Sequence, residues 1–144
     1  MIMPLAVMLM VPIAVAAQAG ALSLPRMLVQ PDSLIWTTAP NGIQTTVVLG
    51  DPAKPGIYIQ RLRFPKGTRI MPHMHPDERV AVLLSGSFYF GYGETFDDQG
   101  LTHVVAGTTW TEPSNTGHFA WAKDEDVVVQ VVGHGPSGTV SAKK

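Results

Sequence analysis

Residues 67–86 read GTRIMPHMHPDERVAVLLSG, and this stretch carries two histidines, His73 and His75, that are separated by one residue. In a β-strand, side chains two positions apart leave the same face, so both imidazoles would point toward one spot. Neutral imidazole is the commonest metal ligand among protein side chains. The pair by itself also fits two exposed histidines beside a turn, so its interpretation depends on the rest of the chain.

A second stretch, residues 107–118, reads GTTWTEPSNTGH and ends in a third histidine. Together the two stretches resemble the two sequence motifs of the cupin superfamily. The positions that match the motifs are Gly67, His73, His75, Gly86, Gly107, Pro113 and His118. Asn115 stands where the family has glycine, and asparagine tolerates the left-handed conformation that a turn needs there. The resemblance spans residues 57–132. It implies that His73, His75 and His118 hold one divalent transition metal.

The fourth ligand of the family is a glutamate, but the matching position here is Arg79, and Glu78 precedes it. Three interpretations follow. A β-bulge could return Glu78 to the metal, Arg79 could face the pocket and bind a substrate anion, or both could line a solvated turn. The spacing to Gly86 favours Arg79 inward, with Ala81 and Leu83 on the same side. Because a dication repels an unpaired guanidinium, an inward Arg79 would require an anion between them, which we expect to be a substrate carboxylate or phenolate.

The remainder of the chain is divided into short segments by 14 glycines and 12 prolines, without a long helical period. Many short strands separated by turn signals are typical of an all-β sandwich or barrel. The predicted strands are residues 33–38, 44–49, 57–64, 69–75, 79–85, 87–92, 102–105, 108–110, 118–122 and 127–132. The cupin resemblance selects the double-stranded jelly-roll barrel among these folds.

Residues 1–19 contain no charged side chain, and Ala17-Gln-Ala19 before Gly20 is typical of a cleavage site. We therefore predict a signal peptide over residues 1–19 and a single cupin domain over residues 20–144, secreted or periplasmic. No stable membrane anchor would remain after cleavage. The alternative is an uncleaved membrane anchor.

Composition limits the possible partners and ligands. The formal net charge is −1, and the terminal Lys143-Lys144 is the one basic run, so we expect no nucleic-acid binding. The chain has no cysteine, so histidine, carboxylate and water must hold any metal. His103 and His134 are expected to be structural or exposed, with His134 in a flexible tail.

Three histidines with at most one carboxylate suit Fe, Mn, Ni, Cu or Zn. The resemblance implies a dioxygenase-like or isomerase-like enzyme acting on a small organic substrate. The alternatives are a non-catalytic cupin module that binds a small ligand or a metal, and a structural role with a degenerate site. Residues 80–84 and 127–132 are apolar on both strand faces, so we also predict a homodimer that covers the outer face.

Overall fold

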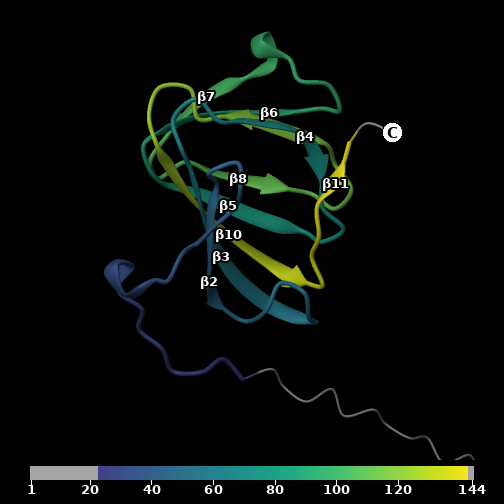
Figure 1. The fold of residues 1–144 in the computed structure, drawn as a ribbon. Helices are drawn as coiled ribbons and strands as arrows, with labels where there is room; N and C mark the ends of the chain where they lie inside the picture. The colour runs from purple at the N-terminus through teal and green to yellow at the C-terminus, as the bar shows by residue number, and fades with distance from the viewer. Residues whose placement is uncertain (1–22, 143–144) are drawn as a thin grey trace, which may run out of the picture.

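The structure, a computed structural model, describes residues 23–142, which fold into two antiparallel β-sheets (Figure 1). The six-stranded sheet has the order β1-β2-β3-β10-β5-β8, and the five-stranded sheet has the order β11-β4-β9-β6-β7. The strands are β1 (Thr37–Thr38), β2 (Gln44–Leu49), β3 (Gly56–Phe64), β4 (Arg69–Met74), β5 (Arg79–Ser85), β6 (Ser87–Tyr92), β7 (Thr102–Val105), β8 (Thr109–Glu112), β9 (His118–Trp121), β10 (Val127–Gly135) and β11 (Val140–Ser141). The predicted all-β jelly-roll barrel is confirmed.

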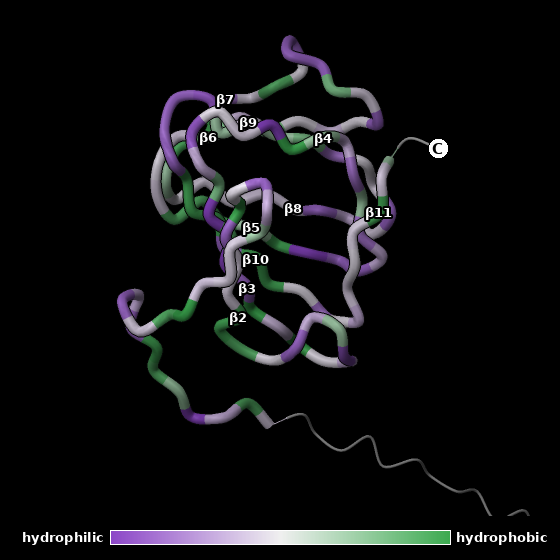
Figure 2. The backbone as a smooth tube through the Cα atoms, in the orientation of Figure 1, coloured by the Kyte–Doolittle hydropathy of each residue, from purple (hydrophilic) through white to green (hydrophobic). Residues whose placement is uncertain are grey.

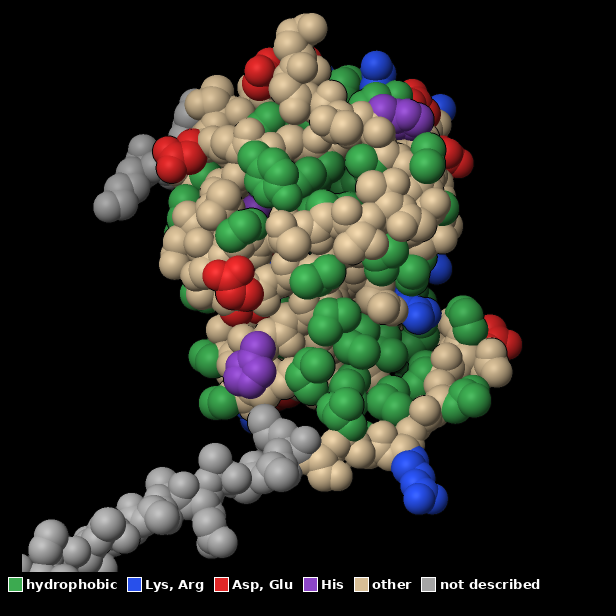
Figure 3. All heavy atoms as spheres, turned by 180° about the vertical axis from the view of Figure 1, so that it is seen from behind, with side chains coloured by type: hydrophobic (Ala, Val, Ile, Leu, Met, Phe, Trp, Pro, Cys, Tyr) green, Lys and Arg blue, Asp and Glu red, His purple; other side chains and the backbone are tan. Residues whose placement is uncertain are grey.

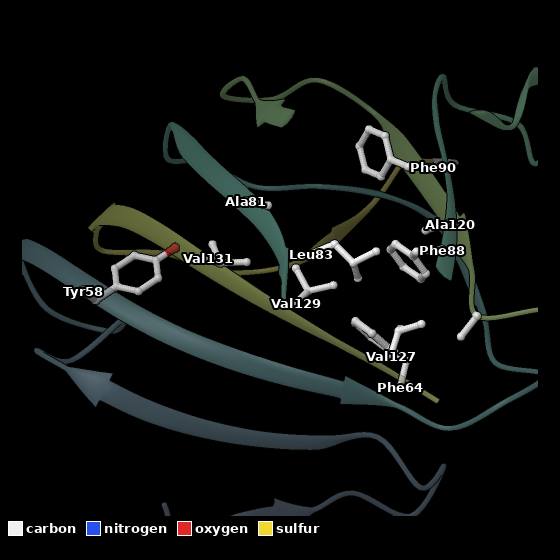
Figure 4. Close-up of a cluster of buried hydrophobic side chains, with 11 residues drawn as sticks. Tyr58, Phe64, Ala81, Leu83, Phe88, Phe90, Ala120, Val127, Val129 and Val131 are labelled. Carbon is white, nitrogen blue, oxygen red and sulfur yellow. The ribbon is translucent and has the colours of Figure 1, made fainter. Parts of the chain in front are cut away.

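Strand alternation fills the barrel interior. In β10, Val127, Val129 and Val131 are buried, while the residues between them are partly exposed. On the neighbouring β5, Ala81 and Leu83 are fully buried. Figure 4 shows these side chains pointing into the space between the sheets. Burial of each larger aliphatic side chain contributes about 1.5–3 kcal/mol to folding, so this layer supplies much of the driving force.

The register of the six-stranded sheet stacks its inward-facing residues in rows. One row is polar and crosses β3, β10, β5 and β8 at Tyr58, Gly133, Arg79 and Glu112. The next row is mostly apolar and consists of Gln60, Val131, Ala81 and Trp110. The barrel therefore has a polar end that faces the histidine-bearing strands β4 and β9, and an apolar middle.

Several strand boundaries differ from the prediction. Only Thr37–Thr38 of residues 33–38 is a strand, because Pro31 starts a short 3₁₀ turn, η1 (Pro31–Ser33). Strand β8 runs on to Glu112, two residues past its predicted end. Strand β10 continues to Gly135, so His134 pairs with Ile57 inside the sheet and is not part of a flexible tail. Strand β11 was not predicted at all.

Two turn residues have the conformation that their role requires. Asn115 has a φ of 54°, so the prediction of a left-handed residue in the glycine position of the second motif is confirmed. Gly86 has a φ of 83°, and a Cβ there would lie 2.7 Å from the carbonyl oxygen of Asp126. The tip of the loop that carries the 3₁₀ turn η2 (Asp98–Gly100) is hydrophilic at the top of Figure 2, which fits its place at the surface.

The predicted signal peptide, residues 1–19, lies outside the described residues. Within residues 23–142, no helix has the length and apolar character needed to cross a membrane.

Candidate metal centre

Three histidines meet at the polar end of the barrel. His73 lies in β4, His75 directly follows that strand, and His118 is the first residue of β9, where it pairs with His73 across the ladder. The ring centroids are 4.3 Å apart for His73 and His118, 4.9 Å for His73 and His75, and 5.2 Å for His75 and His118. One potential ligand atom from each ring lies within 4.8 Å of the others, so the three could hold a metal ion.

Local backbone fixes the orientation of two of these rings. The Nδ1 atom of His73 lies 2.8 Å from the carbonyl oxygen of Met71, and that of His118 lies 3.1 Å from the carbonyl oxygen of Thr116. A carbonyl oxygen can only accept, so each Nδ1 carries the hydrogen and donates it. The lone pair is then on Nε2, which is the arrangement of histidines whose outer hydrogen bond orients them toward a metal.

His75 has two neighbours at the same nitrogen. Its Nδ1 lies 2.6 Å from the carbonyl oxygen of Gly138 and 3.0 Å from Nη1 of Arg79. A guanidinium can only donate and a carbonyl can only accept, so one nitrogen cannot bond both. The shorter contact requires Nδ1–H, which donates to Gly138 and leaves the lone pair on Nε2. That Nε2 atom is buried and has no hydrogen-bond partner in the protein, as a metal ligand requires.

Sequence reasoning missed a buried carboxylate beside the histidines, that of Glu112. Its Oε1 accepts a hydrogen bond from Nε1 of Trp110 at 3.1 Å. Its Oε2 lies 2.9 Å from Nε of Arg79, 3.6 Å from Nε2 of His118 and 3.9 Å from Nε2 of His75. The Nε–H of Arg79 is not aligned for a hydrogen bond to Oε2, so the two side chains interact as an ion pair without that hydrogen bond. Glu112 is thus the acidic group that faces the space between the imidazoles.

Glu78 does not join the histidines. Its side chain is exposed and accepts a hydrogen bond from the backbone N–H of Ser114 at 3.2 Å. The β5–β8 ladder runs without irregularity from Arg79 to Val82, so the β-bulge that would have returned Glu78 to the site is absent. Strand alternation therefore places Glu78 outside and Arg79 inside.

Arg79 lies on the inward face of β5 with Ala81 and Leu83, as its spacing to Gly86 favours. Its side chain is 10% exposed and lines the barrel cavity. Binding of a substrate anion by Arg79 stays a prediction, and in the structure the carboxylate of Glu112 already lies 2.9 Å from Nε of Arg79. The guanidinium therefore has a charge partner before any ligand binds.

Two of the imidazoles, His73 and His75, are biased toward the neutral form that metal ligation requires. Burial lowers the pKa of His73 below its ordinary value. Burial and the nearby Arg79 guanidinium lower the pKa of His75 to about 4. With a neutral ring, the contact of Glu112 with His75 is not an ion pair.

A cavity of about 280 Å³ extends from the histidines into the barrel. Its apolar walls include Leu62, Phe64, Phe88, Phe90, Trp110 and Val129. Rings of this wall continue to the histidines, with centroids 5.0 Å apart for Phe90 and Trp110 and 5.8 Å for Phe90 and His118. A cavity with one polar end and apolar walls suits a small organic ligand.

The remaining described histidines lie apart from this cluster. His103 is exposed, and its ring centroid is 4.9 Å from that of Tyr89. His134 is exposed on β10. Both positions agree with the prediction that these two histidines are structural or solvent-exposed.

No protein-family model matches the chain, and no curated protein matches it. Solved structures with similar folds include an RmlC-like cupin from Shewanella frigidimarina, with 14% identity, a TM-score of 0.61, and coverage of 77% of this chain and 92% of that one. The polyketide cyclase RemF from Streptomyces resistomycificus has 16% identity, a TM-score of 0.61, and coverage of 81% and 86%.

A structure from work on the DMSP lyases RdDddP and RnDddQII has 16% identity and a TM-score of 0.58 over 71% of this chain. The present chain spans 57% of the length of that protein. At these identities the likenesses show the fold alone, and that fold is the cupin barrel.

Proposed function

We propose that this chain binds one divalent transition metal through Nε2 of His73, His75 and His118. The observation that carries the proposal is that the Nδ1 atom of each of the three rings lies within hydrogen-bond distance of a backbone carbonyl oxygen. This contact assigns the hydrogen to Nδ1 and leaves the three Nε2 lone pairs available beside a buried carboxylate. In a chain without cysteine, this donor set fits Fe, Mn, Ni, Cu or Zn.

We further propose that the bound metal serves dioxygenase-like or isomerase-like chemistry on a small organic substrate in the barrel cavity. When bound, such a metal would polarise a substrate oxygen or, if redox-active, activate O₂. Phe88, Phe90 and Trp110 would hold the apolar part of the substrate and exclude water. The Oε2 atom of Glu112 faces the space beside the histidines, so it is placed to accept a proton from a bound ligand, while Arg79 keeps the carboxylate in position.

Metal analysis of the purified chain tests the binding proposal. We expect one metal per chain, and a sharp loss of metal in each of the variants His73→Ala, His75→Ala and His118→Ala. His103→Ala is the matched control because His103 is exposed and lies apart from the cluster. Full metal content in His118→Ala, together with loss in the control, would refute the assignment.

Turnover distinguishes an enzyme from a binding module. The metal-loaded chain would be supplied with a panel of phenolic and enol compounds, and O₂ uptake and product formation would be followed. Uptake that disappears in Glu112→Gln would support an oxidative enzyme. Bound metal and bound ligand without any turnover would favour the non-catalytic cupin module.

The homodimer is proposed from exposed hydrophobic side chains. Val47, Ile57, Val80 and Leu84 are 39–47% exposed, and Figure 3 shows hydrophobic side chains gathered on one face of the molecule. Large apolar patches are uncommon on monomers, so a second copy is the proposed cover. Light scattering that shows a monomer at high concentration would contradict this.

Export through a cleaved signal peptide is likewise a proposal, supported by the uncharged residues 1–19 and the Ala17-Gln-Ala19 site. The intact mass of the mature protein should correspond to a chain that begins at Gly20. A mature chain that begins near Met1 would favour the uncleaved anchor.

A further inference from the structure

We propose that the segment of residues 136–142, here named the C-terminal strap, sets the tautomer of His75 and thereby decides whether its Nε2 can be a metal ligand. The strap would act as a positioning element for the His75 ring. The inference is drawn from the geometry of the metal-free protein, and only its consequence for metal affinity rests on the proposed function.

The strap closes one end of the barrel. It leaves the six-stranded sheet at the end of β10 and joins the five-stranded sheet as β11, beside β4 (Figure 1, yellow). The backbone N–H of Ser137 donates to the carbonyl of Pro52 at 2.7 Å, and that of Ala142 donates to the carbonyl of Pro72 at 3.1 Å. The strap is therefore hydrogen-bonded near both of its ends.

Side chains add to this docking. The Oγ atom of Ser137 lies 3.2 Å from Oη of Tyr58, which donates to Oδ2 of the buried Asp77 at 2.7 Å. Ala142 is 9% exposed, and Thr139 lines the cavity. The strap is consequently a wall of the ligand cavity as well as a cover for the polar end.

Among the three clustered histidines, only His75 takes the acceptor for its Nδ1–H from this strap. The strap also pairs with the backbone of His73 through Ser141, but the Nδ1 atoms of His73 and His118 donate to carbonyls two residues before them in the chain. The carbonyl that accepts from His75 belongs to Gly138, 63 residues away in sequence. The orientation of the His75 ring therefore requires the strap to be docked.

Arg79 competes with the strap for the same nitrogen. Its Nη1 lies 3.0 Å from Nδ1 of His75, and it can only donate. While the strap is docked, Nδ1 carries the hydrogen and donates to Gly138. When the strap leaves, Nδ1 loses its acceptor and accepts from Arg79. The Nδ1 proton passes to water, and Nε2 gains one from water. The neutral ring then has no lone pair on Nε2 to offer a metal.

The test is the tautomer of His75, read from long-range ¹⁵N–¹H NMR spectra of the metal-free, full-length chain. In the wild type we expect the Nδ1–H form for all three clustered histidines. In Ala142→Glu, a carboxylate would be placed in a buried position, which should undock the strap. We then expect His75 to change to the Nε2–H form, while His73 and His118 stay unchanged.

Two further variants sharpen the test. Val140→Glu places the same charge on the same strap at a side chain that is 58% exposed, and we expect it to keep the wild-type spectrum. Adding Arg79→Met to Ala142→Glu removes the competing donor, so the preference for Nε2–H should disappear. An Nε2–H tautomer of His75 in the wild type would overturn the inference, and this result requires no variant to fold. Retention of Nδ1–H in Ala142→Glu, with fast amide exchange at Ser137, would overturn it as well.

Cobalt(II) titration separates this inference from the proposed function. Loss of an outer hydrogen-bond partner of a ligating histidine weakens metal binding about 10–100-fold, which is the effect expected in Ala142→Glu and absent in Val140→Glu. A wild-type chain that binds no cobalt would contradict the proposed function, whereas the tautomer experiment would still decide the role of the strap.

Discussion

Acidification of the metal-free protein from pH 7.5 to pH 5 should destabilise the fold through His75. Burial and Arg79 lower the pKa of His75 to about 4 in the folded protein, against an ordinary value of 6.5. Between these values the unfolded chain binds a proton that the folded chain does not. The stability that the neutral ring provides is therefore fully present above pH 6.5, and it is lost as the pH falls toward 4.

The size of the effect follows from the two pKa values. The whole shift corresponds to about 3 kcal/mol, and about 2 kcal/mol of this would be lost by pH 5. Burial lowers the pKa of His73 in the same direction, so its contribution has the same sign. A domain of ordinary stability has only about 5–15 kcal/mol, so the loss is large enough to measure.

Urea unfolding of the chelator-treated protein at both pH values gives the measurement. The wild type should lose about 2 kcal/mol more than His75→Gln between pH 7.5 and pH 5, because the variant has no ring to protonate. His134→Gln removes an exposed histidine and should behave as the wild type does. An equal loss in the wild type and in His75→Gln would refute the reasoning.

Two further predictions concern the polar row. Glu112→Gln should weaken metal binding about tenfold, because it removes the acidic group beside the imidazoles. Glu78→Gln should leave metal binding unchanged, because the Glu78 side chain is exposed and accepts a hydrogen bond from Ser114. Calorimetric titration would compare the two variants, and weaker binding in Glu78→Gln alone would restore Glu78 as the ligand. Gly133→Ala should destabilise the fold by about 2 kcal/mol, because its Cβ would lie 2.5 Å from Oη of Tyr58 and 2.7 Å from Oδ2 of Asp77. Gly138→Ala, whose Cβ would meet nothing within 4 Å, is the control, and equal melting temperatures for the two variants would contradict the packing argument.

The sequence predicted those features that depend on motif spacing or on the chemistry of a single position. Motif spacing predicted that His73, His75 and His118 form one cluster, and the structure brings them together. Turn residues such as Asn115 and Gly86 could also be identified, because their conformation follows from chemistry at a single position. The choice between Glu78 and Arg79 depended only on strand parity, which the closing glycine of the motif indicated.

Glu112 was missed because its importance comes from pairing across the sheet. The predicted strand stopped at Trp110, before Pro113, although alternation from Trp110 would have placed Glu112 on the same inward face. Its partnership with Arg79 depends on the β5–β8 register, which a single sequence does not specify. The sequence therefore predicted a substrate anion as the partner of Arg79 and did not indicate the carboxylate that the chain itself places beside it.

The C-terminal strap was missed for a similar reason. Gly133, Gly135, Pro136 and Gly138 are typical of an irregular tail. In the structure, Gly133 provides the space that Tyr58 and Asp77 occupy, and Gly138 supplies the carbonyl for His75. Such contacts between distant parts of the chain leave no periodic signal.

The most direct test of the central claim is X-ray absorption spectroscopy of the chain after metal removal and refilling with one equivalent of zinc. The account predicts stoichiometric binding, three imidazole nitrogens at about 2.0–2.1 Å, and at least one oxygen ligand. Loss of one imidazole from the spectrum in His118→Ala should accompany weaker binding. Failure to bind zinc stoichiometrically, or a spectrum without histidine ligands, would contradict the account.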